Sequence, residues 1–296
     1  MPSPVLAELI AGMRAGGIDF AGNPQQARAD FEALLATMPA DPALTFTATQ
    51  LGGVPALHAD TGAQGAGALL YMHGGAYLGG SASGYRGLAA EIGKVLGLPL
   101  WSLDYRLAPE HRFPAAIEDT VAAYRALLDA GTAPGRIVIA GDSAGGGLAL
   151  ATLVKLRQEG LPLPAAGYLL SPWADLACDG PTMASKAAAD PSLDAAGLLA
   201  SAAHYLGTHD AAHPLASPVN ADLSGLPPLL VQVGSSEILL GDSVLVADRA
   251  GAAETHVQLE VWPEMIHVFQ SFHFMLPEGR AALDSAGAFL RARLSA

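Results

Sequence analysis

The chain has 296 residues, about half of them apolar, enough to bury a large core without disulfides or metals. Its formal net charge of −13 argues against nucleic acid or an anionic membrane as a partner, because both favour basic patches. Cys178 is the single cysteine, which excludes an internal disulfide and a cysteine metal cluster.

The first residues, MPSPVLAELIAGMRAGG, show no basic leader followed by a long apolar run. No segment approaches the roughly 20 uninterrupted apolar residues of a membrane span, so we expect a cytoplasmic protein. Helical patterns occupy 4–14 and 24–38, the second with Asn23 as a cap and Pro24 at its first position. Strand patterns follow at 44–50 and 54–60, with a glycine pair between them that predicts a hairpin.

After residue 60, short apolar runs alternate with helical patterns. This alternation predicts an α/β protein with a mostly parallel sheet and helices on both faces. The expected strands, some with the turn that follows, lie at 67–75, 98–107, 136–140, 165–173, 227–237 and 257–265. The expected helices lie at 83–97, 113–131, 147–160, 241–253 and 278–294.

One stretch interrupts the alternation. From about 178 to 218 there is no clear strand, and the sequence is rich in Ala, Asp, Pro and His. An insertion there would lie at the carboxyl edge of the sheet, where α/β proteins bind ligands. We therefore expect one domain over 1–296, with a cap formed by about 1–40 together with the insertion.

Ser143 lies in the segment IAGDSAGGG, between a predicted strand and a predicted helix. A Gly-x-Ser-x-Gly sequence in that context is typical of a nucleophile raised on a strained turn. The alternative is an ordinary turn in which Ser143 caps the helix. Asp142, directly before it, is badly placed to serve as the base. A serine hydroxyl needs a base to remove its proton, so the rest of the chain must supply one.

The segment YMHGGAY follows a buried strand and could supply hydrogen bonds to an oxyanion. Glycines let backbone N–H groups approach a developing negative charge closely. We expect Gly74, Gly75 and the helix-start residue Ala144 to be the donors. A phosphate loop is disfavoured because no Gly-Lys-Ser/Thr or Gly-x-Gly-x-x-Gly register is present. His73 precedes the glycines and is interpreted as shaping the loop.

The base and acid are sought in chain order. In α/β-hydrolase topology the order is serine, acid, histidine, and His267 follows the last predicted strand. Glu237 lies in the turn after the preceding strand and is the expected acid. Asp242, five residues on, is the alternative, although a carboxylate there suits the start of the next helix. The pair His209 and His213 has metal-ligand spacing but no evident third ligand, so no metal site is expected.

Four segments occur along the chain in this order: HGGAY, DYRLAPEHRFPAAIED, GDSAGG and MIHVF. Their order and spacing resemble those of a known family. From about residue 40 to the end, the chain resembles the bacterial hormone-sensitive-lipase family of carboxylesterases. That resemblance implies an α/β-hydrolase fold with a helical cap, ester hydrolysis without a cofactor, and the roles assigned above. It also implies that Tyr105, Arg106 and Glu110 brace the loops near the site.

The chain departs from the family pattern twice. Ala76 stands where a third glycine is common, and little loss is expected if the first two glycines donate. Glu237 stands where the usual acid is aspartate, in a turn where Gly241 replaces a second carboxylate. Glutamate is chemically adequate, but its extra methylene changes its reach to His267.

The expected activity is hydrolysis of short- to medium-chain carboxylic esters through an acyl-enzyme, and the expected partner is a small-molecule ester substrate. Tyr77, Trp173 and Tyr205 are candidate pocket residues, since aromatic side chains near the site can line one. A homodimer is possible. The alternatives are a non-enzymatic ligand receptor on the same fold, disfavoured by the presence of His267, and an amidase or peptidase side activity.

Overall fold

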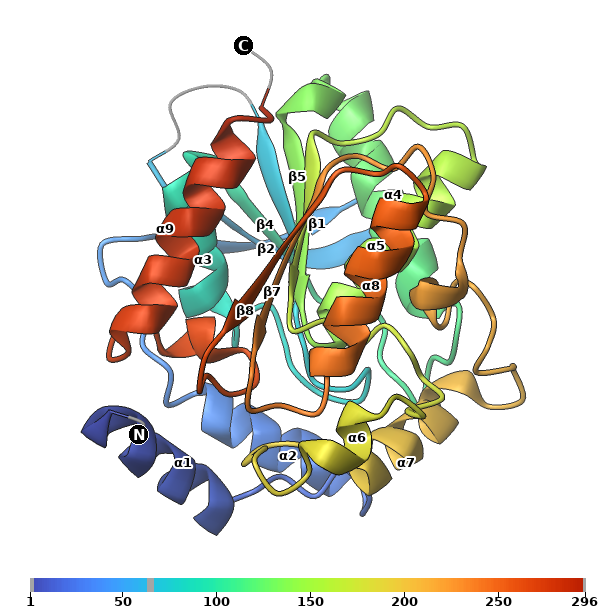
Figure 1. Cartoon of the computed structure of the whole chain (residues 1–296). Coiled ribbons are helices and arrows are strands. Elements are labelled where there is room, and N and C mark those ends of the chain that lie inside the picture. Colours follow the sequence, from blue (N-terminus) through green and yellow to red (C-terminus); the bar gives the residue numbers. More distant parts are fainter. Residues whose placement is uncertain (1–2, 63–66, 295–296) are drawn as a thin grey trace.

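The computed structural model describes residues 3–62 and 67–294, and a single twisted sheet runs through its centre (Figure 1). Its strands are β1 (Phe46–Leu51), β2 (Val54–Ala59), β3 (Ala68–Met72), β4 (Leu100–Leu103), β5 (Ile137–Asp142), β6 (Ala166–Leu170), β7 (Leu229–Gly234) and β8 (Val257–Trp262). They are ordered β1-β2-β4-β3-β5-β6-β7-β8. The β1–β2 hairpin and the β2–β4 pair are antiparallel, and the other pairs are parallel. The α/β architecture with a mostly parallel sheet, which the alternation predicted, is therefore confirmed.

Helices cover both faces of the sheet (Figure 1). On one face α3 (Arg86–Leu96) packs against α9 (Pro277–Arg291), and on the other lie α4 (Ala115–Asp129), α5 (Ala144–Gln158) and α8 (Leu240–Ala252). The central strands β3, β5, β6 and β7 are buried along their whole length, because alternate side chains point to opposite faces and helices cover both faces. In β3, Leu70 joins the core beneath α4 and α5, whereas Leu69 joins the core beneath α3 and α9.

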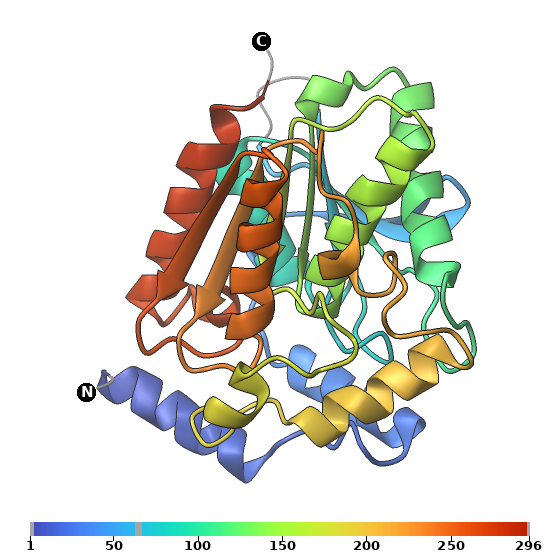
Figure 2. The same cartoon turned by 45° about the vertical axis from the view of Figure 1, so that its right-hand side comes forward.

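The remaining α-helices gather beyond the carboxyl ends of the parallel strands (Figure 2). They are α1 (Pro4–Ala15) and α2 (Pro24–Leu35) from the start of the chain, and α6 (Thr182–Ser185) and α7 (Ala195–Leu206) from the inserted stretch. The predicted cap of α2 is present, since the Asn23 side chain accepts the N–H groups of Gln25 and Gln26. Short 3-10 turns occupy Pro134–Arg136, Pro218–Asn220 and Phe269–Phe272.

Candidate active site

Ser143 occupies a sharp turn between β5 and α5. Its φ of 54° and ψ of −122° place a non-glycine residue in a region that L-residues avoid. A side chain at Gly145 would put its Cβ 2.1 Å from the Met72 carbonyl oxygen, so the close approach of β3 requires glycine there. The Ser143 side chain makes no capping hydrogen bond, which disfavours the alternative that it merely caps the helix.

His267 and Glu237 form a hydrogen-bonded pair. Glu237 follows β7 and is fully buried, and His267 lies in the loop after β8. The Nδ1 atom of His267 lies 2.7 Å from Oε2 of Glu237. Because a carboxylate only accepts, Nδ1 carries the proton and Nε2 is left as the acceptor nitrogen.

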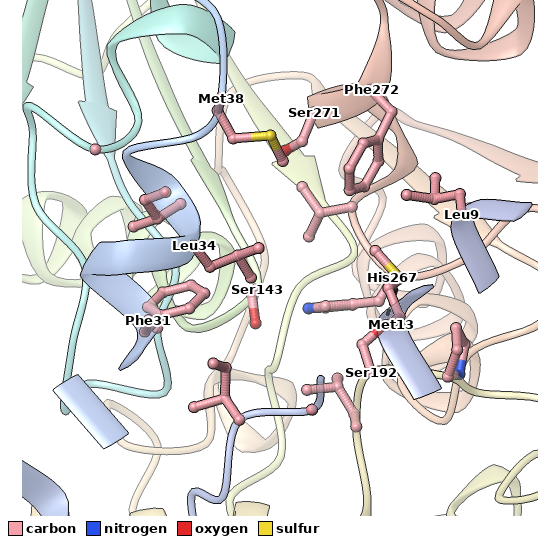
Figure 3. A pocket seen from close by; sticks show the side chains of 18 of the residues that line it. Leu9, Met13, Phe31, Leu34, Met38, Ser143, Ser192, His267, Ser271 and Phe272 are labelled. Carbon is pink, nitrogen blue, oxygen red and sulfur yellow. Dashed lines mark hydrogen bonds between the residues drawn. The ribbon is translucent and has the colours of Figure 1, made fainter. Parts of the chain in front are cut away.

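Ser143 and His267 line one cavity, with the imidazole edge directed toward the hydroxyl (Figure 3). No hydrogen bond between the two side chains is present in the described residues. Such bonds are often long without substrate and tighten when it binds. The arrangement therefore brings together a hydroxyl, an imidazole and a carboxylate that are far apart along the chain.

The charges around His267 favour its protonated form. Burial by itself disfavours the imidazolium, but the negative charge and hydrogen bond of Glu237 outweigh it and raise the pKa of His267 above its ordinary value. Asp190 and Asp142 add to this effect from farther away. An imidazole so placed is well suited to accept a proton and hold the resulting charge.

Asp242, the alternative acid, forms its described hydrogen bonds with the backbone of another segment and not with His267. Its Oδ2 accepts the backbone N–H groups of Ala174 and Asp175, each at 2.9 Å. Burial raises the pKa of Asp242 to about 7. It lies in the first turn of α8, as expected for a carboxylate at a helix start, and it has no hydrogen bond to His267 among the described contacts.

Asp142 shapes the site and does not face the cavity. It is fully buried, and its Oδ1 accepts the Tyr71 hydroxyl at 2.6 Å and the Gly74 N–H at 2.9 Å. Burial raises the pKa of Asp142 to about 6 against the opposing effect of the Tyr71 hydrogen bond. The carboxylate before Ser143 thus ties the end of β5 to the loop that follows β3.

This bond corrects one expected donor. The single N–H of Gly74 is already given to Asp142, and Gly74 does not line the cavity. Gly75 and Ala76 do line it, and their N–H groups, like that of Ala144, have no hydrogen-bond partner within the described part of the chain. The expectation for Gly74 was wrong, because which N–H of the loop turns inward depends on a side-chain partner that the motif alone does not reveal.

The neighbours of the loop follow the expected bracing. His73 donates from Nδ1 to the Gly74 carbonyl at 2.7 Å, and its ring stacks on Tyr105. Tyr105 in turn donates its hydroxyl to the His73 carbonyl. Glu110 pairs with Arg28 of α2 at 2.8 Å, and Arg106 pairs with Asp119 of α4. These contacts tie the glycine loop to the segment 105–110, and they tie that segment to α2 and α4.

The cavity has a volume of about 470 Å³ and an apolar wall (Figure 3). Residues of α1 and α2, of the loop at 191–193, and of the segment after His267 form it. The labelled lining residues include Leu9, Met13, Phe31, Leu34, Met38, Ser192, Ser271 and Phe272. Glu8 is the one carboxylate among the described lining residues, which include His267 but no lysine or arginine. Such a surface suits uncharged, apolar groups.

The three aromatic residues expected to line the pocket do not. Tyr77, Trp173 and Tyr205 are at most 2 % exposed and are absent from the described cavity wall. The rings of Tyr77 and Tyr205 stack with centroids 3.9 Å apart, and Trp173 lies beside Tyr77. Their apolar area is used in core packing. The true wall residues of α1 and α2 carried only an ordinary amphipathic pattern, so the sequence offered no signal for them.

In the described residues no group of three or more His, Cys, Asp and Glu side chains could hold a metal ion. His213 accepts the Leu215 N–H on Nδ1, and both His209 and His213 pack on Phe113. Among the helices that the structure describes, none is long and apolar enough to cross a membrane.

Comparison with known proteins adds independent findings. Residues 69–271 match a family model described as an alpha/beta hydrolase fold. The chain is 52 % identical over 223 residues to an acetyl-hydrolase of Streptomyces hygroscopicus, covering 75 % of each protein. It is 35 % identical over 268 residues to an esterase of Acinetobacter venetianus, covering 90 % of this chain and 88 % of the relative.

Solved structures agree with these relatives. One is an esterase from the bacterial hormone-sensitive lipase family, with a TM-score of 0.95, 44 % identity and full coverage of both chains. Another is EstE5, soaked with p-nitrophenyl butyrate, with a TM-score of 0.95, 42 % identity and full coverage of both chains.

Proposed function

Because this chain belongs to the bacterial hormone-sensitive-lipase family of α/β-hydrolase esterases, we propose that it hydrolyses carboxylic esters with Ser143 as nucleophile, His267 as base and Glu237 as the orienting acid. The observation that carries this assignment is the Glu237–His267 hydrogen bond beside the strained Ser143 turn, with Ser143 and His267 in one cavity.

The proposed cycle begins when His267 Nε2 takes the proton of Ser143 as the hydroxyl oxygen attacks the ester carbonyl. Glu237 keeps the proton on Nδ1 and stabilises the imidazolium. The imidazolium then protonates the leaving alcohol. A water molecule, deprotonated by the same histidine, releases the carboxylic acid from the acyl-enzyme.

The tetrahedral oxygen anion needs donors aimed at it. We assign the N–H groups of Gly75, Ala76 and Ala144, which lack other partners in the described structure; Gly75 and Ala76 line the cavity with Ser143, and Ala144 is the residue that follows it. Each such donor is worth about 2.7 to 4 kcal/mol in comparable enzymes. This set replaces the one that included Gly74.

The substrate class follows from the cavity. Its volume of about 470 Å³ and its apolar wall favour uncharged esters with short to medium acyl chains. We further propose that residues 1–40 and 178–218 act as a cap, because α1, α2 and the loop at 191–193 supply much of that wall. A series of p-nitrophenyl esters from acetate to laurate tests the chain-length preference, and a maximum at the longest chain would contradict it.

The decisive experiment is Ser143→Ala with p-nitrophenyl butyrate as substrate. We expect the wild type to hydrolyse it, to be inactivated by a serine-directed organophosphate, and to lose turnover in the variant without a change of fold. Removing the nucleophile of such a triad costs about 10⁶-fold in kcat. A folded Ser143→Ala protein with wild-type turnover would overturn the assignment.

A further inference from the structure

The segment 170–173, which begins with the last residue of β6, contacts the segments of all three proposed catalytic residues. Its backbone holds Ser143 from both sides: the Ser143 N–H donates to the Leu170 carbonyl at 2.8 Å, and the Trp173 N–H donates to the Ser143 carbonyl at 2.9 Å. A side chain at Gly147 would put its Cβ 2.0 Å from the Trp173 carbonyl oxygen. One of the glycines after Ser143 is therefore explained by the close fit of this segment.

A side chain of the same segment reaches the other two segments. The Ser171 hydroxyl donates to Oε1 of Glu237 at 2.7 Å, the carboxylate oxygen that does not face His267. The same hydroxyl oxygen accepts the N–H of Val268, the residue after His267, at 3.2 Å. Ser171 is fully buried, so water cannot replace either bond without opening the core.

Ser171 and Val268, which this hydrogen bond joins, both have a strained backbone. Ser171 has a φ of 44° and Val268 a φ of 48°, and a left-handed conformation is a true outlier for a β-branched residue. Strain of this kind persists only where surrounding contacts impose it. The hydrogen bond from Val268 to Ser171 is one such contact, and it sets the direction in which the chain leaves His267.

We propose that Ser171 is a positioning residue, which sets the spacing of Glu237 and His267 relative to Ser143 through its buried hydroxyl. This inference rests on the proposed function. The backbone contacts of the segment 170–173 to Ser143 do not depend on the side chain, so substitution of Ser171 removes the links to the acid and base loops alone. Its loss should reduce kcat and leave KM unchanged, because Ser171 does not line the cavity.

The test compares Ser171→Ala with a matched control, Ser102→Ala. Ser102 is a fully buried serine of β4 whose hydroxyl has no partner within the described structure. We expect Ser171→Ala to lower kcat for p-nitrophenyl butyrate by about 10- to 100-fold, the effect of losing a charge-assisted hydrogen bond. Ser102→Ala should keep the wild-type kcat. A folded Ser171→Ala protein with wild-type kcat would overturn the proposal.

Two further measurements separate positioning from general loosening. With Glu237→Gln already present, adding Ser171→Ala should cost much less than it does alone, since the two act as a unit; an equal loss in both backgrounds contradicts the proposal. The downfield Nδ1 proton resonance of His267 should shift in Ser171→Ala and stay in place in Ser102→Ala. An unshifted resonance contradicts the proposal as well.

If Ser171→Ala does not fold, Ser171→Cys keeps a similar shape with a weaker donor, and its kcat should fall below the wild-type value. Wild-type kcat in that variant would refute the role of the hydroxyl. Ser143→Ala, measured in parallel, keeps the two hypotheses apart. Activity lost in Ser143→Ala but intact in Ser171→Ala rejects the positioning role only, whereas activity intact in Ser143→Ala rejects the proposed function itself.

Discussion

At the scale of single residues, two carboxylates compete for one role, and their surroundings separate them. One carboxylate oxygen of Glu237 forms a hydrogen bond with His267, whereas Oδ2 of Asp242 accepts two backbone N–H groups. We expect Glu237→Gln to lower kcat by about 10⁴-fold, because the amide cannot hold the required imidazole tautomer. Asp242→Asn should keep kcat near the wild-type value. Steady-state kinetics with p-nitrophenyl butyrate distinguishes the two, and the reverse ranking would make Asp242 the acid.

The raised pKa of His267 sets the expected pH dependence. The histidine must be neutral to accept the proton of Ser143, so kcat/KM should rise with pH through a pKa above about 6.5. In Glu237→Gln the stabilising charge is lost, and the midpoint of the residual activity should move to lower pH. A pH–rate profile of both proteins checks this, and an unmoved midpoint would mean that Glu237 does not control the imidazole.

The convergence of Ser143, His267 and Glu237 could be predicted because each follows the end of a strand, and parallel strands bring those ends to one edge of the sheet. The sequence-based prediction was wrong for Gly74, and the reason again lies in a single side chain. The glycines of a loop are alike in sequence, and only the Asp142 acceptor distinguishes the N–H that is occupied from those that face the cavity. It failed at Tyr77 and Tyr205 because two buried rings that stack on one another have the same composition as two rings that line a pocket.

At the scale of elements, Asp142 joins β5 to the loop after β3, and this joint can be tested. Asp142→Ala removes the acceptor of the Gly74 N–H, so Gly75 and Ala76 should lose their fixed orientation. We expect kcat to fall about tenfold or more, with weaker binding of a boronic-acid transition-state analogue in proportion. Asp142→Asn keeps an oxygen for both donors and should be milder. Equal kcat in Asp142→Ala and the wild type would show that the loop holds its shape alone.

The boundaries of elements were predictable where turn chemistry marks them. Asn23 before Pro24 gives the start of α2, and Gly97 ends α3 in a left-handed conformation. The end of α2 carries no such residue: the apolar pattern continues to 38, but the helix ends at Leu35. The role of α1 and α2 in the cavity could not be predicted from the sequence. An amphipathic pattern shows that a helix buries one face, but it does not show which part of the protein that face packs against.

At the scale of the whole molecule, buried carboxylates couple stability to pH. The pKa of Asp242 is raised to about 7, whereas an unfolded aspartate titrates near 3.9. A carboxylate whose pKa is raised in the folded state contributes stability below the unfolded pKa, and that contribution is lost as pH rises through the folded pKa. Asp142, with its pKa raised to about 6, acts in the same direction.

We therefore expect Asp242→Asn to raise the melting temperature more at pH 8, above the folded pKa, than at pH 5, where only part of the stability has been lost. The neutral amide can still accept the N–H groups of Ala174 and Asp175, and it carries no charge to bury. Thermal unfolding followed by circular dichroism at both pH values measures this. A variant that is destabilised equally at both pH values would show that the raised pKa of Asp242 does not affect the stability of the fold.

The homodimer stays a prediction, which light scattering can check.

The cavity wall and the proposed catalytic residues come from different parts of the polypeptide. Ser143, Glu237 and His267 stand on turns anchored to the sheet, whereas Leu9, Met13, Phe31 and Leu34 belong to the first two helices. Replacing the opening forty codons of the gene with those of a relative would thus exchange most of one wall and leave the chemistry in place. Recombination near residue 40 could therefore change the ester preference, in evolution or by design, while the turns that carry Ser143, Glu237 and His267 stay the same.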